Sequence, residues 1–380
     1  MISKKATQIS PFIVMDVMEK AAEMERKGDN IIHLEVGEPD FETPECIKEA
    51  AINALMKGKT HYTHSLGLLE LREAICEHYL EKYNVDVSPD QVLVTSGTSP
   101  AMLLLFSALL DPGDEIILSN PSYSCYSNIV EFADGKPVWV DVYEEDGFQY
   151  LPDKIVEKIT KRTKGIIINS PSNPTGNILS PERMDKISRL EPMVISDEIY
   201  HGLVYKEKEH TILEFTDRAF ILNGFSKLYA MTGWRLGYTI VPEEFIRPLQ
   251  KIHQNFFISA NAFVQWAGIA ALKEAGNEVA KMKEIYDERR GFMISRLKEI
   301  GFGITVDPTG AFYVLGNAKK FSKDSYGFAF DILENAKVGV TPGIDFGSNG
   351  EGYIRFSYAN SLENIGEAMD RIADYLEQRL

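Results

Sequence analysis

The chain has 380 residues, of which 44% are hydrophobic and 25% charged, a balance that fits a folded protein and excludes intrinsic disorder. Its 40 basic and 56 acidic residues give a net charge of −16, which disfavours nucleic acid and anionic membranes as partners. No Gly/Ser/Pro linker, repeat or low-complexity tract divides the sequence, so we expect one large globular unit with a smaller subdomain.

The N-terminal segment and the three cysteines bear on cellular location and on redox or metal chemistry. Residues 1–20 contain an apolar run that Asp16 interrupts, a pattern of neither a signal peptide nor a membrane span. We therefore expect a cytoplasmic protein with no membrane partner. Cys46, Cys76 and Cys125 lack CxxC spacing and His-rich surroundings, so buried free thiols are expected, with neither disulfide nor metal.

Seven short apolar runs alternate with helix-length segments between residues 91 and 241. Each run is rich in Val, Ile and Leu and is bounded by Gly, Pro, Asn or Asp, which is typical of strands buried on both faces. The runs are 91–95, 115–119, 137–142, 165–169, 193–196, 219–223 and 236–241. With intervening helices such as 99–110 and 152–160, they predict an α/β fold whose mostly parallel seven-stranded sheet is sandwiched by helices.

The pattern changes beyond residue 243. Residues 261–300 form one long helical stretch, which predicts a bent or broken helix joining two subdomains. The remaining sequence mixes strand and helix patterns on a smaller scale, as expected for a small α+β domain. We expect an N-terminal arm with part of the small domain (1–45), a large domain (46–285) and a C-terminal small domain (286–380).

Small and hydroxyl residues follow the first predicted strand. In open α/β sheets, ligands bind beyond the carboxyl ends of the strands, so the residues at these ends are the candidate site. Gly97, Thr98 and Ser99 begin the helix after strand 91–95. Free backbone N–H groups there suit a phosphate, although an ordinary helix cap is the alternative interpretation.

Polar side chains also follow two later strands. Asn173 lies in a turn made by two prolines and a glycine, and it offers an amide at the cleft. Asp197 ends an apolar strand, and Tyr200 follows three residues later. Burying a carboxylate in such surroundings costs free energy unless a cation pairs with it or several donors hydrogen-bond to it. An N-cap or a simple salt bridge is the alternative interpretation of Asp197.

Lys227 lies after the sixth strand among Gly, Phe, Leu, Tyr and Ala, and Arg235 follows eight residues later. Desolvating an ammonium group costs several kcal/mol, so packing does not explain this position. A desolvated lysine readily shifts its pKa and forms a Schiff base with a carbonyl compound. Together with a phosphate site and the carboxylate of Asp197, it indicates pyridoxal 5′-phosphate (PLP), whose pyridinium nitrogen needs an acidic partner.

The sequence resembles the class I/II aminotransferases of the fold-type I PLP enzymes along nearly its whole length. The resemblance rests on seven stretches in the family's order and spacing. These are HLEVGEPDFETP (33–44), THYTHSLGLLELREAI (60–75), VTSGTSPAM (94–102), SPSNPTG (170–176), ISDEIY (195–200), GFSKLYAMTGWRLGY (224–238) and YIRFSYA (353–359).

The resemblance implies specific roles at the PLP ring. Lys227 would be the Schiff-base lysine and the base that moves the substrate proton, and Asp197 would pair with the pyridinium nitrogen. Tyr200 and Asn173 would hydrogen-bond the phenolic oxygen, and Tyr123 would stack on the ring.

The resemblance also implies which residues bind the phosphate and the substrate carboxylate, and that a partner subunit contributes to the site. The phosphate would be held by Gly97, Thr98, Ser99, Ser226 and Arg235. Arg355, with the Gly37 backbone and Asn173 nearby, would bind the α-carboxylate of the substrate. Tyr62 would reach the phosphate of the neighbouring subunit, which implies a homodimer with shared sites. An ion-paired arginine on a sheet face is the alternative for Arg355.

One position departs from the family pattern. Many relatives carry a phosphate-binding serine three residues before the lysine, where this chain has Gly224, which puts the affinity for the phosphate in doubt. Other polar and aromatic residues have simpler interpretations. We interpret Tyr126 and Trp234 as packing residues. His33, His61 and His64 lack the spacing of metal ligands and are expected to be structural or surface residues.

The resemblance implies transfer of the α-amino group of an L-amino acid to a 2-oxo acid such as 2-oxoglutarate. Aspartate is the favoured donor and aromatic amino acids come next. His253 is a candidate for the distal carboxylate of aspartate, and Phe256 and Phe257 for an aromatic side chain. A lyase or decarboxylating condensation on the same scaffold remains open. A PLP-sensing regulator also remains, but it would need a DNA-binding module, and the net charge disfavours DNA.

Overall fold

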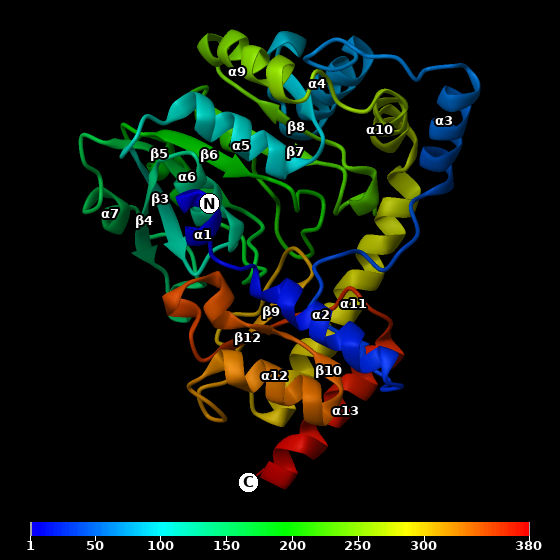
Figure 1. Cartoon of the computed structure of the whole chain (residues 1–380), viewed down its shortest axis with the longest axis vertical. Coiled ribbons are helices and arrows are strands. Elements are labelled where there is room, and N and C mark those ends of the chain that lie inside the picture. The colour runs from blue at the N-terminus through cyan, green and yellow to red at the C-terminus, as the bar shows by residue number, and fades with distance from the viewer. Residues whose placement is uncertain (1, 380) are drawn as a thin grey trace.

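A seven-stranded sheet forms the centre of the larger lobe in the computed structural model, which describes residues 2–379 (Figure 1). The strand order is β2-β8-β7-β6-β5-β3-β4, and only β8 runs antiparallel to its neighbours. The strands are β2 (Val92–Thr95), β3 (Glu115–Asn120), β4 (Lys136–Asp141), β5 (Thr163–Asn169), β6 (Met193–Asp197), β7 (Ala219–Gly224) and β8 (Gly237–Ile240). The predicted mostly parallel α/β sheet is confirmed.

Helices cover both faces of this sheet because successive strand residues point to opposite faces. In β5, Ile166 and Ile168 pack into one apolar cluster and Ile167 into another. The helices of this lobe are α3 (Glu45–Met56), α4 (Leu69–Tyr83), α5 (Thr98–Leu109), α6 (Cys125–Phe132), α7 (Pro152–Val156), α8 (Pro181–Ser188), α9 (Glu243–Phe256) and α10 (Ala262–Glu274). The helix predicted over 152–160 is shorter than expected, because α7 ends at Val156, four residues earlier.

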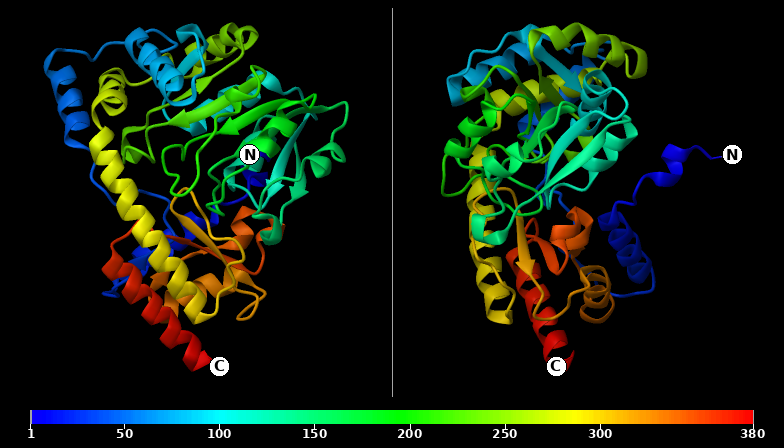
Figure 2. Two further views of the ribbon diagram at one scale, coloured as in Figure 1. Left: turned by 180° about the vertical axis from the view of Figure 1, so that it is seen from behind. Right: turned by 90° about the vertical axis from the view of Figure 1, so that its left-hand side faces the viewer.

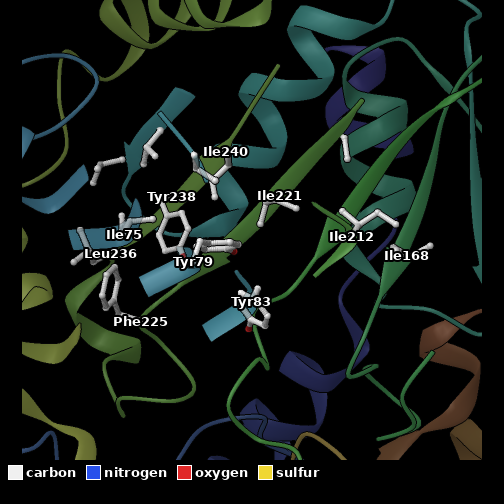
Figure 3. Close-up of a cluster of buried hydrophobic side chains, with 14 of the residues drawn as sticks. Ile75, Tyr79, Tyr83, Ile168, Ile212, Ile221, Phe225, Leu236, Tyr238 and Ile240 are labelled. Carbon is white, nitrogen blue, oxygen red and sulfur yellow. The ribbon is translucent and has the colours of Figure 1, made fainter. Parts of the chain in front are cut away.

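An aromatic cluster fills the core beneath the antiparallel part of the sheet (Figure 3). Tyr79 of α4 meets Tyr238 of β8 edge to face, with ring centroids 6.5 Å apart. Phe225, two residues before Lys227, packs against the same ring of Tyr238 at 6.1 Å. Because Phe225 is 1% exposed, this packing fixes the backbone just before the lysine.

The smaller lobe contains two short sheets and three helices. Strand β1 (Ile32–His33) pairs with β10 (Val338–Gly339), and β12 (Tyr353–Ser357) lies between β11 (Thr341–Pro342) and β9 (Tyr313–Asn317). The helices are α11 (Gly276–Ile300), α12 (Ser325–Ala336) and α13 (Leu362–Arg379).

The long helical stretch 261–300 is broken, as predicted. Helices α10 and α11 meet at Ala275, and α11 runs from the large lobe down along the small one (Figures 1 and 2). The boundary expected at residue 285 between the large and the small domain falls inside α11. This boundary remains a prediction. Within residues 2–379 no helix combines the length and the apolar character needed to cross a bilayer.

The N-terminal segment bridges the two lobes. Helix α1 (Lys4–Gln8) is tied to the large lobe, where Lys5 Nζ donates to the main-chain oxygen of Phe132 at 2.6 Å. Helix α2 (Ile13–Arg26) packs Val17 and Ala21 against the small lobe. Residues 9–12 therefore pass from one lobe to the other, as the blue segment in Figure 1 shows.

The three cysteines are free thiols and are half-buried rather than fully buried. Burial raises the pKa of the Cys76 thiol to about 11, so this thiol stays protonated at neutral pH.

Candidate active site

A cavity of about 350 Å³ lies at the carboxyl ends of β5, β6 and β7, and residues of the small lobe and of the N-terminal segment line its other sides. Because these strands are parallel, Asn169 and Asp197 end in register at the same edge of the sheet. Of the residues that the resemblance assigns to PLP or to the α-carboxylate, all except Gly97 and Tyr62 line the cavity. These are Gly37, Thr98, Ser99, Tyr123, Asn173, Asp197, Tyr200, Ser226, Lys227, Arg235 and Arg355.

Lys227 points its amine into this cavity from the loop after β7. Its Nζ donates to the main-chain oxygen of Gly37 at 2.6 Å. Burial lowers the pKa of Lys227 to about 8, with Arg355 and Arg235 adding to the decrease and Glu38 opposing it. About a tenth of the amine is therefore unprotonated at pH 7 and about half at pH 8, and this unprotonated form is the nucleophile or base.

Asp197 is a buried carboxylate that faces the cavity with 4% of its surface exposed. Burial raises the pKa of Asp197 to about 6, while donors from Tyr126 and from the Ile199 backbone oppose the increase. The Ile199 N–H lies 3.1 Å from Oδ1. All of these donors are neutral, so the carboxylate is suited to a cationic group placed in the cavity.

Tyr126 is a site residue that we had interpreted as a packing aromatic. It is 1% exposed, and its hydroxyl donates to Asp197 Oδ2 at 2.6 Å. The sequence offered no signal for this contact, because Tyr126 lies on α6 and Asp197 ends β6, 71 residues later. The hydrogen bond favours the ionised form of Asp197 and fixes the orientation of its carboxylate.

The N-terminus of α5 lies at one corner of the cavity. Gly97 is the N-cap residue, with φ 100°, and no side chain caps the helix. A Cβ at Gly97 would lie 2.6 Å from Arg235 Nη2, so only glycine allows this guanidinium to approach the helix end. Free N–H groups, the hydroxyls of Thr98 and Ser99, and Arg235 together suit a phosphate group.

Arg355 is a buried guanidinium, 3% exposed, on β12 at the opposite side of the cavity. Its guanidinium donates to the side-chain amide oxygen of Asn173, the main-chain oxygen of Glu35 and the hydroxyl of Thr341, all of which are neutral. Its Nε has no partner in residues 2–379. The rings of Tyr313 and Phe346 lie 4.4 and 5.0 Å from its central carbon. A buried cation without a counter-ion is a strong site for a carboxylate.

Besides Gly97, four sequence candidates do not line the cavity. Tyr62 is 81% exposed on the surface of the large lobe. His253 is buried, lies 2.7 Å from the main-chain oxygen of Ser65, and is not among the residues that line the cavity. Phe256, which is 76% exposed, and Phe257 are also absent from the lining.

The structure also gives a reason for Gly224. A Cβ at this position would lie 2.9 Å from the Cα of Gly237 and 3.0 Å from the main-chain oxygen of Leu236. The two strands β7 and β8 are therefore crowded here, and a serine would require backbone movement.

The N-terminal segment supplies an apolar wall that the sequence did not reveal. Phe12, Val14, Met15 and Met18 line the cavity, and the ring of Phe12 meets Tyr123 edge to face at 6.0 Å. The backbone N–H of Ile13 donates to Asp345 Oδ1 at 2.9 Å, which fixes the start of α2 on the small lobe. No spacing pattern within residues 12–18 could indicate that they meet residues more than a hundred positions away.

The fold is that of the fold-type I enzymes, which use PLP. The family model of aminotransferase class I and II matches residues 29–372. The chain therefore belongs to the class I and II aminotransferase family, whose members are PLP-dependent, and it is a transaminase.

Known proteins are similar to this chain over nearly its whole length. It is 43% identical to a (5-formylfuran-3-yl)methyl phosphate transaminase from Methanocaldococcus jannaschii over 100% of both chains. It is 40% identical to an aspartate aminotransferase from Pyrococcus horikoshii over 99% of this chain and 97% of the relative. The structure of the Thermus thermophilus aspartate aminotransferase with maleate superposes with a TM-score of 0.95 at 36% identity, covering 99% of both chains.

Proposed function

We propose that this transaminase uses PLP to move the α-amino group of an L-amino acid, with aspartate as the first candidate, to a 2-oxo acid such as 2-oxoglutarate. The observation that carries the proposal is one cavity holding an amine of lowered pKa together with a buried guanidinium whose hydrogen-bond partners within residues 2–379 are all neutral. Relatives named aspartate aminotransferases support the choice of donor.

The residues present fit PLP in charge and position. The N-terminus of α5 and Arg235 would hold the phosphate, Asp197 would hold the ring nitrogen, and Tyr123 would cover the ring. Gly97 supports this fit, because a side chain there would displace Arg235. When bound, PLP withdraws electrons from the substrate Cα and so makes its proton acidic.

The chain's own residues would bind and orient the substrate and move its proton. The planar fork of Arg355 binds the α-carboxylate with two parallel hydrogen bonds, which fixes the direction of the Cα–H bond. Lys227 Nζ takes this proton and returns it, since its lowered pKa leaves the amine partly free near neutral pH. The apolar wall made by Phe12, Val14, Met15 and Met18 would shield the reacting atoms from water on that side of the cavity.

Covalent capture of PLP by the apo-protein should become faster as the pH rises, and the rate should level off above about 8. Only the unprotonated amine is a nucleophile, and burial lowers the pKa of Lys227 to about 8. The rate is measured by absorbance between pH 6 and 11 and divided by the rate constant of Nα-acetyl-lysine, calculated at each pH for its unprotonated ε-amine alone, which removes the ionisations of PLP but not that of Lys227. A midpoint near the ordinary lysine pKa of about 10.4 would contradict the assignment.

An aromatic amino acid is the second candidate donor, because the cavity wall made by Phe12, Met15 and Met18 is apolar. The cations of the cavity are Lys227, Arg235 and Arg355, and all three already have roles in the proposal. Within residues 2–379 no further basic side chain lines the cavity for a distal carboxylate. Use of aspartate would therefore draw on a cation of a second subunit.

A panel of amino donors with 2-oxoglutarate tests the proposal. Aspartate, phenylalanine, tyrosine, alanine and lysine are each supplied to the PLP-loaded enzyme, and the 2-oxo acid, glutamate and ammonia are quantified. We expect one 2-oxo acid and one glutamate for each donor consumed, without ammonia. Release of ammonia without glutamate would indicate a lyase, and failure of every α-amino acid would overturn the proposal.

We also infer a homodimer in which Tyr62 of each subunit completes the site of the other. The support is that Tyr62 is 81% exposed and absent from the cavity of its own chain, although the resemblance assigns it to the phosphate. Mixing Tyr62→Ala with Lys227→Ala subunits should then restore activity at limiting PLP, because each hybrid dimer contains one complete site. No gain over the separate variants would refute the shared site.

A further inference from the structure

Tyr313 lies at the centre of the cavity wall and has no role in the function proposed so far. It is the first residue of β9, pairs with Ser357 of β12, and is 1% exposed. Its hydroxyl lies 2.8 Å from the hydroxyl of Tyr200, and the Arg355 guanidinium carbon lies 4.4 Å from the centre of its ring. One side chain therefore touches both the residue assigned to the phenolic oxygen and the residue assigned to the carboxylate.

The Tyr313 hydroxyl also packs against the backbone that receives Lys227. A Cβ built on Gly37 would lie 2.0 Å from this hydroxyl, so the phenol occupies the space that any other residue at position 37 would need. The main-chain oxygen of the same Gly37 accepts the hydrogen bond from Lys227 Nζ. Tyr313 thus connects the small lobe to three groups of the site.

The bond between the two tyrosines has one donor, and the chemistry of the site decides which tyrosine donates. In the proposed function, Tyr200 donates its proton to the phenolic oxygen of PLP, so its own oxygen is left as an acceptor. Tyr313 then donates to Tyr200. Hydrogen bonds in such a chain polarise one another, so Tyr200 becomes a stronger donor toward the phenolic oxygen.

The ring of Tyr313 has a separate task. Arg355 lies between Tyr313 and Phe346, and its hydrogen bonds to Asn173 and Thr341 lie at 2.8 and 3.1 Å. Stacking on an aromatic face fixes the plane of a guanidinium and leaves its edge free for hydrogen bonds. Binding of a carboxylate by two parallel hydrogen bonds depends on this plane.

We propose that Tyr313 is a positioning residue that aims the proton of Tyr200 at the phenolic oxygen and holds the plane of Arg355 for the α-carboxylate. This inference rests on the proposed function. The two tasks are separable, because the hydroxyl serves the first and the ring serves the second.

The variant Tyr313→Phe removes the hydroxyl and keeps the ring. We expect the pH midpoint of the visible absorbance of the PLP-loaded enzyme to rise by about 0.5 to 1 unit, because a weaker Tyr200 donor stabilises the negative phenolic oxygen less. The KM for the amino donor should change by less than about twofold, since the charge-assisted bonds of Arg355 are intact. An unchanged midpoint would overturn the role of the hydroxyl.

The variant Tyr313→Leu removes the ring as well. We expect binding of the 2-oxo acid substrate to the PLP-loaded enzyme to weaken about 5- to 30-fold relative to Tyr313→Phe, as measured by spectroscopic titration. Equal binding by the two variants would overturn the role of the ring. Should Tyr313→Leu fail to fold, Tyr313→His, which keeps an aromatic ring of smaller area, gives the same comparison with a smaller expected loss.

Tyr358→Phe is the matched control. Tyr358 is fully buried in the same lobe, and its hydroxyl donates to the main-chain oxygen of Ala311 at 2.9 Å, away from the cavity lining. Its loss should leave the midpoint and the affinity for the 2-oxo acid at wild-type values, and an equal shift in both variants would make Tyr313 merely structural. A wild-type enzyme that shows no visible absorbance with PLP would instead refute the proposed function itself.

Discussion

Replacing Lys227 with alanine should reduce transamination by at least about 10³-fold. The variant loses both the amine that attaches PLP and the base that moves the substrate proton, and a general base alone contributes about 10² to 10⁴ in rate. The fold should persist, because removing a desolvated amine exposes no unpaired buried charge. The rate is measured for a single turnover with excess PLP, so that weaker cofactor binding does not limit it.

Lys227→Arg is the matched control for this prediction. Arginine keeps the positive charge, but its guanidinium is not deprotonated in proteins and cannot act as the base. Both variants should therefore be equally inactive. Activity within about tenfold of the wild type in either variant would show that Lys227 acts through its charge or not at all.

Replacing Arg355 with glutamine should lower kcat/KM by about two to three orders of magnitude. A charge-assisted pair with the substrate carboxylate is lost, and truncating one partner of such a buried pair costs about 2–5 kcal/mol. The effect should be similar for amino donors and 2-oxo acids, because both carry the α-carboxylate. Steady-state kinetics with one donor and one acceptor measure this loss.

Arg290→Gln provides the comparison for Arg355. Arg290 is also a buried arginine, 3% exposed, but it pairs with Asp287 at 2.5 Å and donates to the main-chain oxygen of Pro308, outside the cavity. Its replacement should destabilise the protein and leave the KM for both substrates unchanged. If the two variants change KM alike, or if Arg355→Gln leaves KM unchanged, the carboxylate assignment fails.

The sheet was predictable because buried strands leave a strong local pattern. Residues 166–168 are three consecutive isoleucines bounded by Gly165 and Asn169, and they lie within β5. The polar residues after these strands were predictable as a group for the same reason, since parallel strands end at one edge. Lys227 and Asp197 were therefore expected near each other before any distance was known.

The residues that contact the predicted site residues were not predictable, because these contacts depend on how distant segments pack. Tyr126 was interpreted as a packing residue and Tyr313 drew no prediction, because their partners lie 71 and 113 positions away in the sequence. The same holds for Phe12, which reaches the cavity only because residues 9–12 cross between the lobes. A single sequence carries no periodic signal for such contacts.

His253 failed as a candidate for a related reason. Its neighbours in sequence suggested a cleft position, but α9 turns the imidazole inward to the main-chain oxygen of Ser65. Burial lowers the pKa of His253, so the ring is neutral at physiological pH and could not serve as a cation for a distal carboxylate. The donor preference therefore has to be settled by the substrate panel.

Reduction of the PLP-loaded enzyme with borohydride, followed by peptide mass mapping, tests the central claim most directly. The account predicts that one peptide gains the mass of a phosphopyridoxyl group and that fragmentation places this group on Lys227. A group found on another lysine, or a protein that gains no mass after reduction, would contradict it.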